Sequence, residues 1–246
     1  MIPHIVHYCW FGRGEKSPLI QKCIASWKEK LPGYEFMEWT EDNFDVNATL
    51  FTRQAYEAKR YAYVSDYARL CALERYGGVY LDTDEELLRD ISPLLEQAEL
   101  VAGFESPEYV MVGLLAAAKG HALIREFRDY YARRAFLGED GTIVAQPNPR
   151  VFTALLQSRG LVTDGHRQTL PDGICIWPVE TFCARDGETL QYHITENTYG
   201  VQYYEASWMP RKDKFKWAVR KAVARRFGPK VYTRMMAVYE TLTGKR

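Results

Sequence analysis

The chain has 246 residues, enough for one large domain with a short appendage, and 47% of them are apolar, as in a globular core. The net charge is zero, but residues 211–246 carry +10 and residues 1–210 carry −10. We expect no membrane span, because no run of about 18 apolar residues occurs, and no signal peptide, because a charged start followed by an apolar run is missing.

The first elements are predicted in the order strand, helix, strand. Residues 2–10 are rich in β-forming side chains, and Ser17-Pro18 is a typical helix start, followed by apolar residues at helical spacing. Residues 34–39 alternate between polar and apolar side chains and predict a second strand. This β-α-β order favours a parallel sheet.

The middle of the chain predicts one helical stretch over 55–76, ended by Gly77-Gly78, and then a strand over 79–81. Residues 87–98 read as helical or irregular, and 100–104 as a buried strand. The apolar run 111–118 fits a strand or a helix. We further expect a helix over 121–136, a loop over 138–150, a helix over 151–157 and a strand over 174–178.

Residues 211–246 predict two amphipathic helical pieces separated by Gly228-Pro229, so the expected division is a domain over 1–210 and a basic helical tail over 211–246. The five cysteines form no C-x-x-C pair and indicate reduced thiols in a cytosolic protein.

The most informative motif is the pair Asp82 and Asp84, which follows the apolar strand 79–81. In an extended segment the side chains at these two positions would point the same way and could meet at one cation. Ligands of open α/β sheets bind beyond the carboxyl ends of the strands, and carboxylates suit Mg²⁺ or Mn²⁺ that is shared with phosphates. The alternative is a solvated acidic loop, because Glu85 and Glu86 follow directly.

A second pair, Asp66 and Arg69, lies one helix earlier at a spacing that places both on one helix face. Taken alone, it fits a surface ion pair worth about 0.3 kcal/mol. The alternative is that Asp66 accepts hydrogen bonds from sugar hydroxyls and that Arg69 donates to hydroxyls or a phosphate.

Four blocks occur together in this order: residues 2–12, 62–69, 77–84 and 207–208. In this combination the chain resembles the Asp-x-Asp glycosyltransferases of family 32, with yeast mannosyltransferases and bacterial capsular polysaccharide transferases, and more distantly the glucosylating domain of large clostridial toxins. The resemblance covers residues 1–210. It implies a GT-A fold, which is an α/β mixed sheet flanked by helices. It also implies a retaining, metal-dependent transfer from a nucleotide sugar, expected to be a UDP-sugar, to a glycan or lipid-linked acceptor.

The resemblance also implies roles for individual residues. Trp10 would stack on the base, and Asp82 and Asp84 would hold the metal, which is Mn²⁺ or Mg²⁺. The remaining expected donor-binding residues are Ser65, Asp66, Arg69 and Tyr80, and the expected closing loop supplies Ser207, near the metal, and Trp208, over the diphosphate.

One departure from the family concerns the third metal ligand. Family members usually carry a histidine shortly before the Ser-Trp pair, and this chain has Gln202 in or near that place. Gln202, Glu205 or Ser207 could substitute for it. The chain offers no carboxylate that stands out as a nucleophile, so front-face attack is our hypothesis for retention.

The basic tail mixes cations with aromatic residues, which is typical of helices that lie on anionic membranes. We therefore expect a cytoplasmic protein that attaches to the inner face of the membrane, acts in cell-surface polysaccharide synthesis, and binds no nucleic acid. Two alternatives stay open. One is an inactive sugar-nucleotide-binding protein. The other is a phosphohydrolase of the haloacid dehalogenase kind, in which Asp82 would be the nucleophile.

Overall fold

The structure, a computed structural model, describes residues 1–96, 98–185 and 191–205. The predicted tail over 211–246 lies outside the described residues. None of the helices in the described ranges is long and apolar enough to cross a membrane. The five cysteines are all free thiols, as expected.

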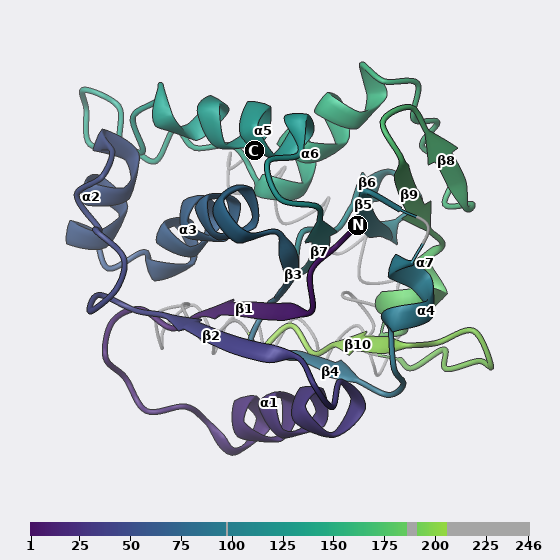
Figure 1. Cartoon of the computed structure of the whole chain (residues 1–246). Coiled ribbons are helices and arrows are strands. Elements are labelled where there is room, and N and C mark those ends of the chain that lie inside the picture. Colours follow the sequence, from purple (N-terminus) through teal and green to yellow (C-terminus); the bar gives the residue numbers. More distant parts are fainter. Residues whose placement is uncertain (97, 186–190, 206–246) are drawn as a thin grey trace, which may run out of the picture.

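The strands are short and alternate with helices along most of the chain (Figure 1). The strands are β1 (Ile5–Cys9), β2 (Glu35–Trp39), β3 (Gly78–Leu81), β4 (Glu85–Leu87), β5 (Leu100–Ser106), β6 (Tyr109–Val110), β7 (Leu114–Ala117), β8 (Gln168–Leu170), β9 (Ile174–Trp177) and β10 (Gly200–Gln202). The helices are α1 (Pro18–Lys30), α2 (Leu50–Glu57), α3 (Tyr61–Tyr76), α4 (Ser92–Leu95), α5 (Ala122–Ala132), α6 (Asn148–Gln157) and α7 (Val179–Phe182).

The main sheet has the strand order β2-β1-β3-β7-β5-β9-β8, with β6 paired to β5. Strands β2, β1 and β3 are parallel, as the β-α-β pattern predicted, and the antiparallel β7 separates them from β5. Strand β5 therefore runs in the same direction as β1 and β3, and these three strands end at the same edge of the sheet. The predicted mixed α/β sheet flanked by helices is confirmed.

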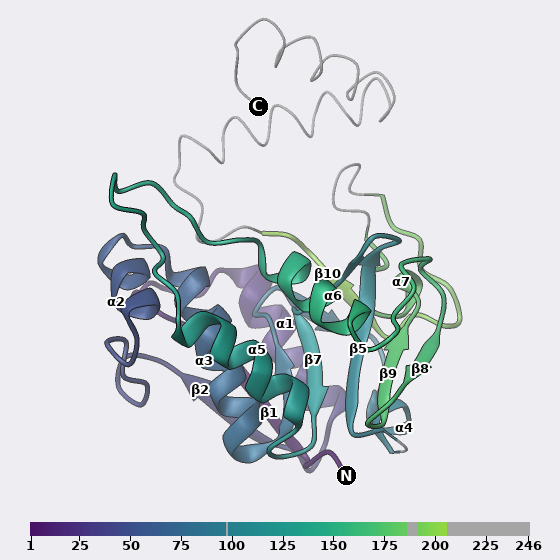
Figure 2. The same cartoon turned by 90° about the horizontal axis from the view of Figure 1, so that it is seen from above.

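Helices cover both faces of this sheet. Helix α1 lies on one face, and α2, α3, α5 and α6 lie on the other (Figure 1). Helix α5 packs against both α3 and α6, and Figure 2 shows these three helices side by side from above. The buried apolar side chains accordingly form two clusters, one for each face.

Local signals explain where several elements begin and end. Ser17 caps α1 by accepting a hydrogen bond from the Ile20 N–H at 3.3 Å. Gly77 ends α3 with a φ of 69°, and Gly78, at φ 103°, lies so close to β1 that a Cβ there would be 2.4 Å from the Ile5 carbonyl oxygen. The Gly-Gly pair thus allows the chain to turn directly from α3 into β3.

The prediction of one helical stretch over 55–76 was wrong. A capping box at Thr49 starts α2 at Leu50, and the helix ends at Glu57. Lys59 then adopts a φ of 56°, and α3 begins only at Tyr61. A left-handed residue interrupts the α-helical hydrogen bonds, so the two helices can point in different directions.

Pairing between distant strands determines the secondary structure of two further regions. The run 111–118, which fitted either element, contains strand β7. Strand β10 pairs antiparallel with β4, with Gln202 opposite Glu85. This second sheet brings residues 200–205 to the end of β3, where the predicted acidic pair lies.

Candidate active site

A cavity of about 740 Å³ opens at the edge where β1 and β3 end. Its size lies within the range of small-molecule sites. The predicted site residues that line it come from several elements and are Trp10, Ser65, Asp66, Arg69, Tyr80, Asp82 and Asp84. Ser207 and Trp208 lie outside the described residues, so their roles stay predictions.

Asp82 and Asp84 lie in a tight turn, not in an extended segment as the sequence suggested. The Glu85 N–H donates to the Asp82 carbonyl oxygen at 2.9 Å, which closes the turn between β3 and β4. The two carboxylates nevertheless interact, since the charge on Asp82 helps to raise the pKa of Asp84. The alternative of a solvated acidic loop is wrong for Glu85, which is completely buried.

Protein donors hold the Asp84 carboxylate on both oxygens. The Gln202 Nε2 donates to Oδ1 at 3.1 Å, and the Glu205 backbone N–H donates to Oδ2 at 2.8 Å. Burial and then the charge of Asp82 raise the pKa of Asp84 to about 6. The protein thus fixes this carboxylate at a place where its negative charge is unfavourable without a nearby cation.

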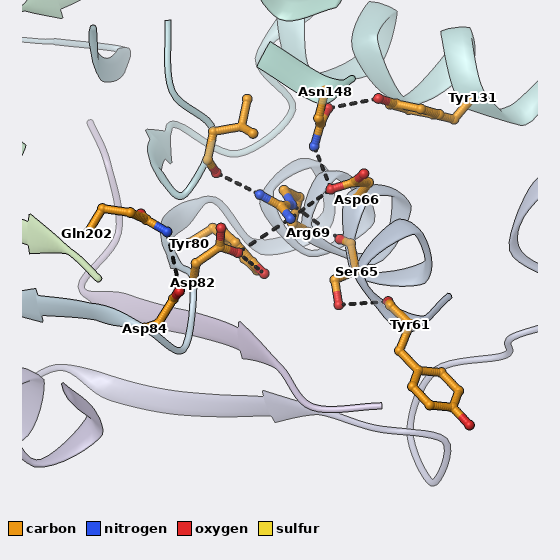
Figure 3. A network of polar contacts seen from close by, with 11 residues as sticks. Tyr61, Ser65, Asp66, Arg69, Tyr80, Asp82, Asp84, Tyr131, Asn148 and Gln202 are labelled. Carbon is orange, nitrogen blue, oxygen red and sulfur yellow. Dashed lines mark hydrogen bonds and ion pairs between the residues drawn. The ribbon is translucent and has the colours of Figure 1, made fainter. Parts of the chain in front are cut away.

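Arg69 is the centre of the polar network in Figure 3. Its side chain is only 4% exposed, and one terminal nitrogen lies 2.8 Å from Asp66 Oδ1 and 3.4 Å from Asp82 Oδ1. The other terminal nitrogen donates to the Val112 carbonyl oxygen at 2.8 Å. The interpretation of Asp66 and Arg69 as a surface pair is therefore wrong. Arg69 joins the two predicted carboxylates, and its direct contact with a donor stays a prediction.

Tyr80 holds Asp82 in place by a hydrogen bond from strand β3. The phenol donates to Asp82 Oδ1 at 2.9 Å, and the Arg69 guanidinium lies 4.4 Å above the Tyr80 ring. The ring is completely buried in strand β3. Asp82 Oδ2 makes no hydrogen bond within the described residues, so this oxygen remains free for a ligand.

Asp66 has a second partner that the sequence did not indicate. The Asn148 Nδ2 donates to Asp66 Oδ1 at 2.7 Å, and the Tyr131 hydroxyl donates to Asn148 Oδ1 at 2.8 Å (Figure 3). Burial raises the pKa of Asp66 to about 6, although the charge of Arg69 acts in the opposite direction. The carboxyl is thus oriented by two side chains.

Trp10 follows β1 and lines the other part of the cavity. Its Nε1 donates to the Gly14 carbonyl oxygen at 2.6 Å, and its backbone N–H donates to the Trp39 carbonyl oxygen at 2.9 Å. The Lys16 ammonium lies 5.6 Å from the ring centroid. The indole is therefore fixed at the edge of the sheet, next to the ends of β1 and β3.

Glu105 also lines the cavity and was missed by the sequence analysis. It lies near the end of β5, on the edge where β1 and β3 end, and its side chain makes no hydrogen bond or ion pair within the described residues. The signal was present, because Glu105 directly follows the predicted buried strand 100–104, as Asp82 follows the strand 79–81. The strand order places Trp10, Asp82 and Glu105 in sequence along this edge.

Burial and the charge of Asp82 raise the pKa of Glu105 from 4.5 to about 7. The folded state therefore keeps a proton that the unfolded chain releases, and its stability falls as the pH rises from about 4.5 to 7. We predict that Glu105→Gln raises the free energy of unfolding at pH 8 by at most about 3 kcal/mol and leaves it nearly unchanged at pH 4.5. Urea denaturation at both pH values checks this, and an equal effect at both would contradict it.

The charge balance of the cavity determines what it can bind. The described residues that line it include six carboxylates and a single cation, Arg69, which is already paired with Asp66 and Asp82. An anionic ligand would be repelled unless a divalent cation came with it. Carboxylate oxygens are the ligands that Mg²⁺ and Mn²⁺ prefer, and Asp82 has a free one, so the residues fit such a cation. Within the described ranges, however, no group of three His, Cys, Asp or Glu side chains could hold a metal.

Part of the cavity lining lies in a region that matches a known protein family. Residues 17–101 match a family model described as "Glycosyltransferase sugar-binding region containing DXD motif". This range contains Asp66 and Arg69 as well as the pair Asp82 and Asp84. Over 142 residues the chain is 28% identical to inositol phosphoceramide mannosyltransferase 3 of Schizosaccharomyces pombe. The aligned region covers 55% of this chain and 38% of that protein. The chain spans well under half the length of this relative.

Two solved structures are similar in outline. The PaToxG glycosyltransferase has a TM-score of 0.46 at 16% identity and covers 64% of this chain and 68% of that one. The galactosyltransferase LgtC, in complex with donor and acceptor sugar analogs, has a TM-score of 0.42 at 13% identity and covers 87% of this chain and 93% of that one.

Proposed function

We propose that this protein transfers a sugar from a nucleotide sugar to a hydroxyl acceptor with the help of a divalent cation. The premise is that residues 17–101 match the sugar-binding region of glycosyltransferases with a DXD motif. The match supports the family resemblance drawn from the sequence. The donor is proposed to be a UDP-sugar, and the cation Mn²⁺ or Mg²⁺.

One observation carries this proposal. Asp82 and Asp84 lie at the carboxyl end of β3 and line the cavity, and the pKa of Asp84 is raised. Asp82 Oδ2 has no hydrogen-bond partner in the part of the chain that the structure describes. A cation bound there would neutralise both carboxylates and allow a diphosphate to enter an otherwise acidic cavity. This arrangement suits the transfer of a group whose leaving group is a diphosphate.

A cation bound at this pair would take up the negative charge that develops on the leaving diphosphate. The residues of the chain prepare the site for it. Arg69 and Tyr80 hold Asp82 in place through Oδ1, while Oδ2 is left for the ligand. Asp66, oriented by Asn148, is proposed to accept hydrogen bonds from donor hydroxyls, and Trp10 to stack on the base.

For the stereochemical course we propose retention by front-face attack. The structure supplies a carboxylate that the sequence did not reveal as a candidate nucleophile, because Glu105 lines the cavity together with Asp66. Mass spectrometry of the enzyme after reaction with a slow donor tests this. A glycosyl adduct on Glu105 or Asp66 would replace front-face attack by a double displacement.

The acceptor is proposed to be a glycan or a lipid-linked sugar of cell-surface polysaccharide synthesis. We also propose that residues 211–246, with their net charge of +10, attach the protein to an anionic membrane face. Co-sedimentation with anionic and neutral vesicles tests the attachment.

The proposed function is tested by measuring UDP release from a panel of UDP-sugars with Mn²⁺ and with excess chelator. We expect release that depends on the metal and on one or a few of the sugars. Trp10→Ala should raise the KM for the donor about 10- to 100-fold through lost stacking, while Trp10→Phe, which keeps an aromatic ring, should stay within about threefold. Donor binding without any release would favour the inactive sugar-nucleotide-binding protein, and no metal-dependent binding of uridine diphosphate would refute the proposal.

A further inference from the structure

Gln202 lies directly beside the acidic pair. It is the last residue of β10, where it pairs with Glu85 of β4, and it is only 9% exposed. It also lines the cavity that contains Asp82 and Asp84. The position of its side chain is therefore fixed by strand pairing and by burial.

The orientation of the Gln202 amide follows from its neighbour. Its Nε2 donates to Asp84 Oδ1 at 3.1 Å (Figure 3). A reversed amide would place Oε1 against a carboxylate oxygen, and neither atom carries a proton to share. Asp84 thus requires the NH₂ group on its own side, and the amide oxygen must face away from Asp84.

That amide oxygen is buried and has no hydrogen-bond partner within the described residues. Gly113 shows where it points. A Cβ built on Gly113 would lie 2.6 Å from Gln202 Oε1 and 3.0 Å from Asp82 Oδ2. Two oxygens that can only accept therefore border one small space, which exists because residue 113 has no side chain. An unpaired buried acceptor is costly unless a ligand satisfies it.

We propose that Gln202 Oε1 is the third protein ligand of the divalent cation, beside Asp82 and Asp84. This inference rests on the proposed function and assigns one further residue of the same site. A neutral amide oxygen is a hard ligand that adds no charge to the cavity. Compared with a histidine at this position, it should shift the relative affinity toward Mg²⁺ and Mn²⁺, because Co²⁺, Ni²⁺ and Zn²⁺ gain more from a nitrogen ligand.

Glu205 is the competing ligand among the described residues. Its Oε1 accepts a hydrogen bond from Ser17 Oγ at 2.8 Å, and its Oε2 has no partner within the described residues. Its backbone N–H holds Asp84 whatever its side chain is. Glu205→Gln therefore serves as the matched control, because it changes a carboxylate next to the site and preserves the contact with Asp84.

The first experiment measures Mn²⁺ binding to the full chain by calorimetry and by electron paramagnetic resonance, with and without uridine diphosphate. We expect Gln202→Ala to weaken the binding of Mn²⁺ at least 10-fold. The Mn²⁺ affinity of Glu205→Gln should stay within about threefold of that of the natural chain. The melting temperature without metal identifies variants that fail to fold. A Gln202→Ala chain that is folded and binds Mn²⁺ within twofold of the natural chain would overturn the inference.

The second experiment separates a ligand from a residue that merely orients Asp84. Gln202→His replaces the oxygen by a nitrogen ligand, so the ratio of the Kd values for Mg²⁺ and Co²⁺ should shift toward Co²⁺ by at least 10-fold. The absorption spectrum of bound Co²⁺ should change at the same time. An unchanged ratio and spectrum would show that residue 202 does not touch the metal.

Failure of this inference can be told apart from failure of the proposed function. If Asp84→Asn abolishes Mn²⁺ binding but the Gln202 variants leave it unchanged, the metal site stands and only the third ligand is wrong. If the natural chain itself binds no Mn²⁺ in the presence of uridine diphosphate, the proposed function fails as well.

Discussion

Replacing Arg69 with methionine is expected to lower the free energy of unfolding at pH 8 by about 3–5 kcal/mol. Methionine preserves part of the volume and removes the cation that, among the described residues, pairs with both Asp66 and Asp82. Both carboxylates would then be left without a counter-charge, Asp66 in a buried position, and the Val112 carbonyl oxygen would lose its donor. Urea denaturation of the metal-free protein measures the loss.

The pH dependence of this loss distinguishes charge from packing. The pKa of Asp66 is already raised to about 6 with Arg69 present, and it rises further without it. Protonation at pH 5 should therefore restore part of the lost stability. Arg13→Met is the control, since it breaks the exposed ion pair with Asp42, and it should change the free energy of unfolding far less than Arg69→Met does. Equal losses for Arg69→Met at pH 5 and pH 8 would mean that packing dominates.

Asp84→Asn is expected to raise stability and abolish function together. The pKa of Asp84 is raised from 3.8 to about 6, so the folded protein loses stability as the pH rises through this range. The pKa shift of Asp84 corresponds to about 3 kcal/mol of lost stability at pH 8. Removing the charge should recover only about 1–2 kcal/mol of this in the metal-free protein, because asparagine cannot accept hydrogen bonds from both Gln202 and Glu205. The gain should vanish near pH 4.

Asp84→Asn should also reduce metal-dependent release of UDP by at least about 100-fold. The cation that stabilises the leaving diphosphate would lose one of its ligands, so its positive charge would no longer be held at the reacting bond. Melting temperature and UDP release are measured on the same preparations. Opposite changes in the two quantities are typical of residues that are kept for function at a cost in stability. A parallel loss of both would make Asp84 a structural residue and would leave the metal without its main ligand.

The elements that the sequence predicted best are those whose signals are local. Strand β1, helix α1 and strand β2 were predicted because Ser17-Pro18 and the alternation over 34–39 act within a few residues. The interruption between α2 and α3 was missed because the left-handed conformation of Lys59 has no composition signal. The sequence predicted an extended segment where Asp82 and Asp84 lie in a turn, because the pairing of β4 with the distant β10 has no local signal.

The site divides in the same way. The acidic pair and Asp66 with Arg69 could be predicted because each pair lies within a few residues of the chain. Asn148 reaches Asp66 across 82 residues, and Gln202 reaches Asp84 across 118. Such contacts depend on the strand order and on helix packing, and no single sequence reveals them. Glu105 is intermediate, since its place after a buried strand was visible and only its burial was not.

The pairing of β10 with β4 also determines when the site can form during synthesis of the protein. A ribosome adds about 5–20 residues per second, so roughly 6–24 s pass between the synthesis of Asp84 and that of Gln202. During that interval the emerging polypeptide contains Asp82 and Asp84 but not strand β10, which pairs with β4. The ability to bind a metal should therefore be among the last properties that the protein acquires, after most of its sheet has been translated.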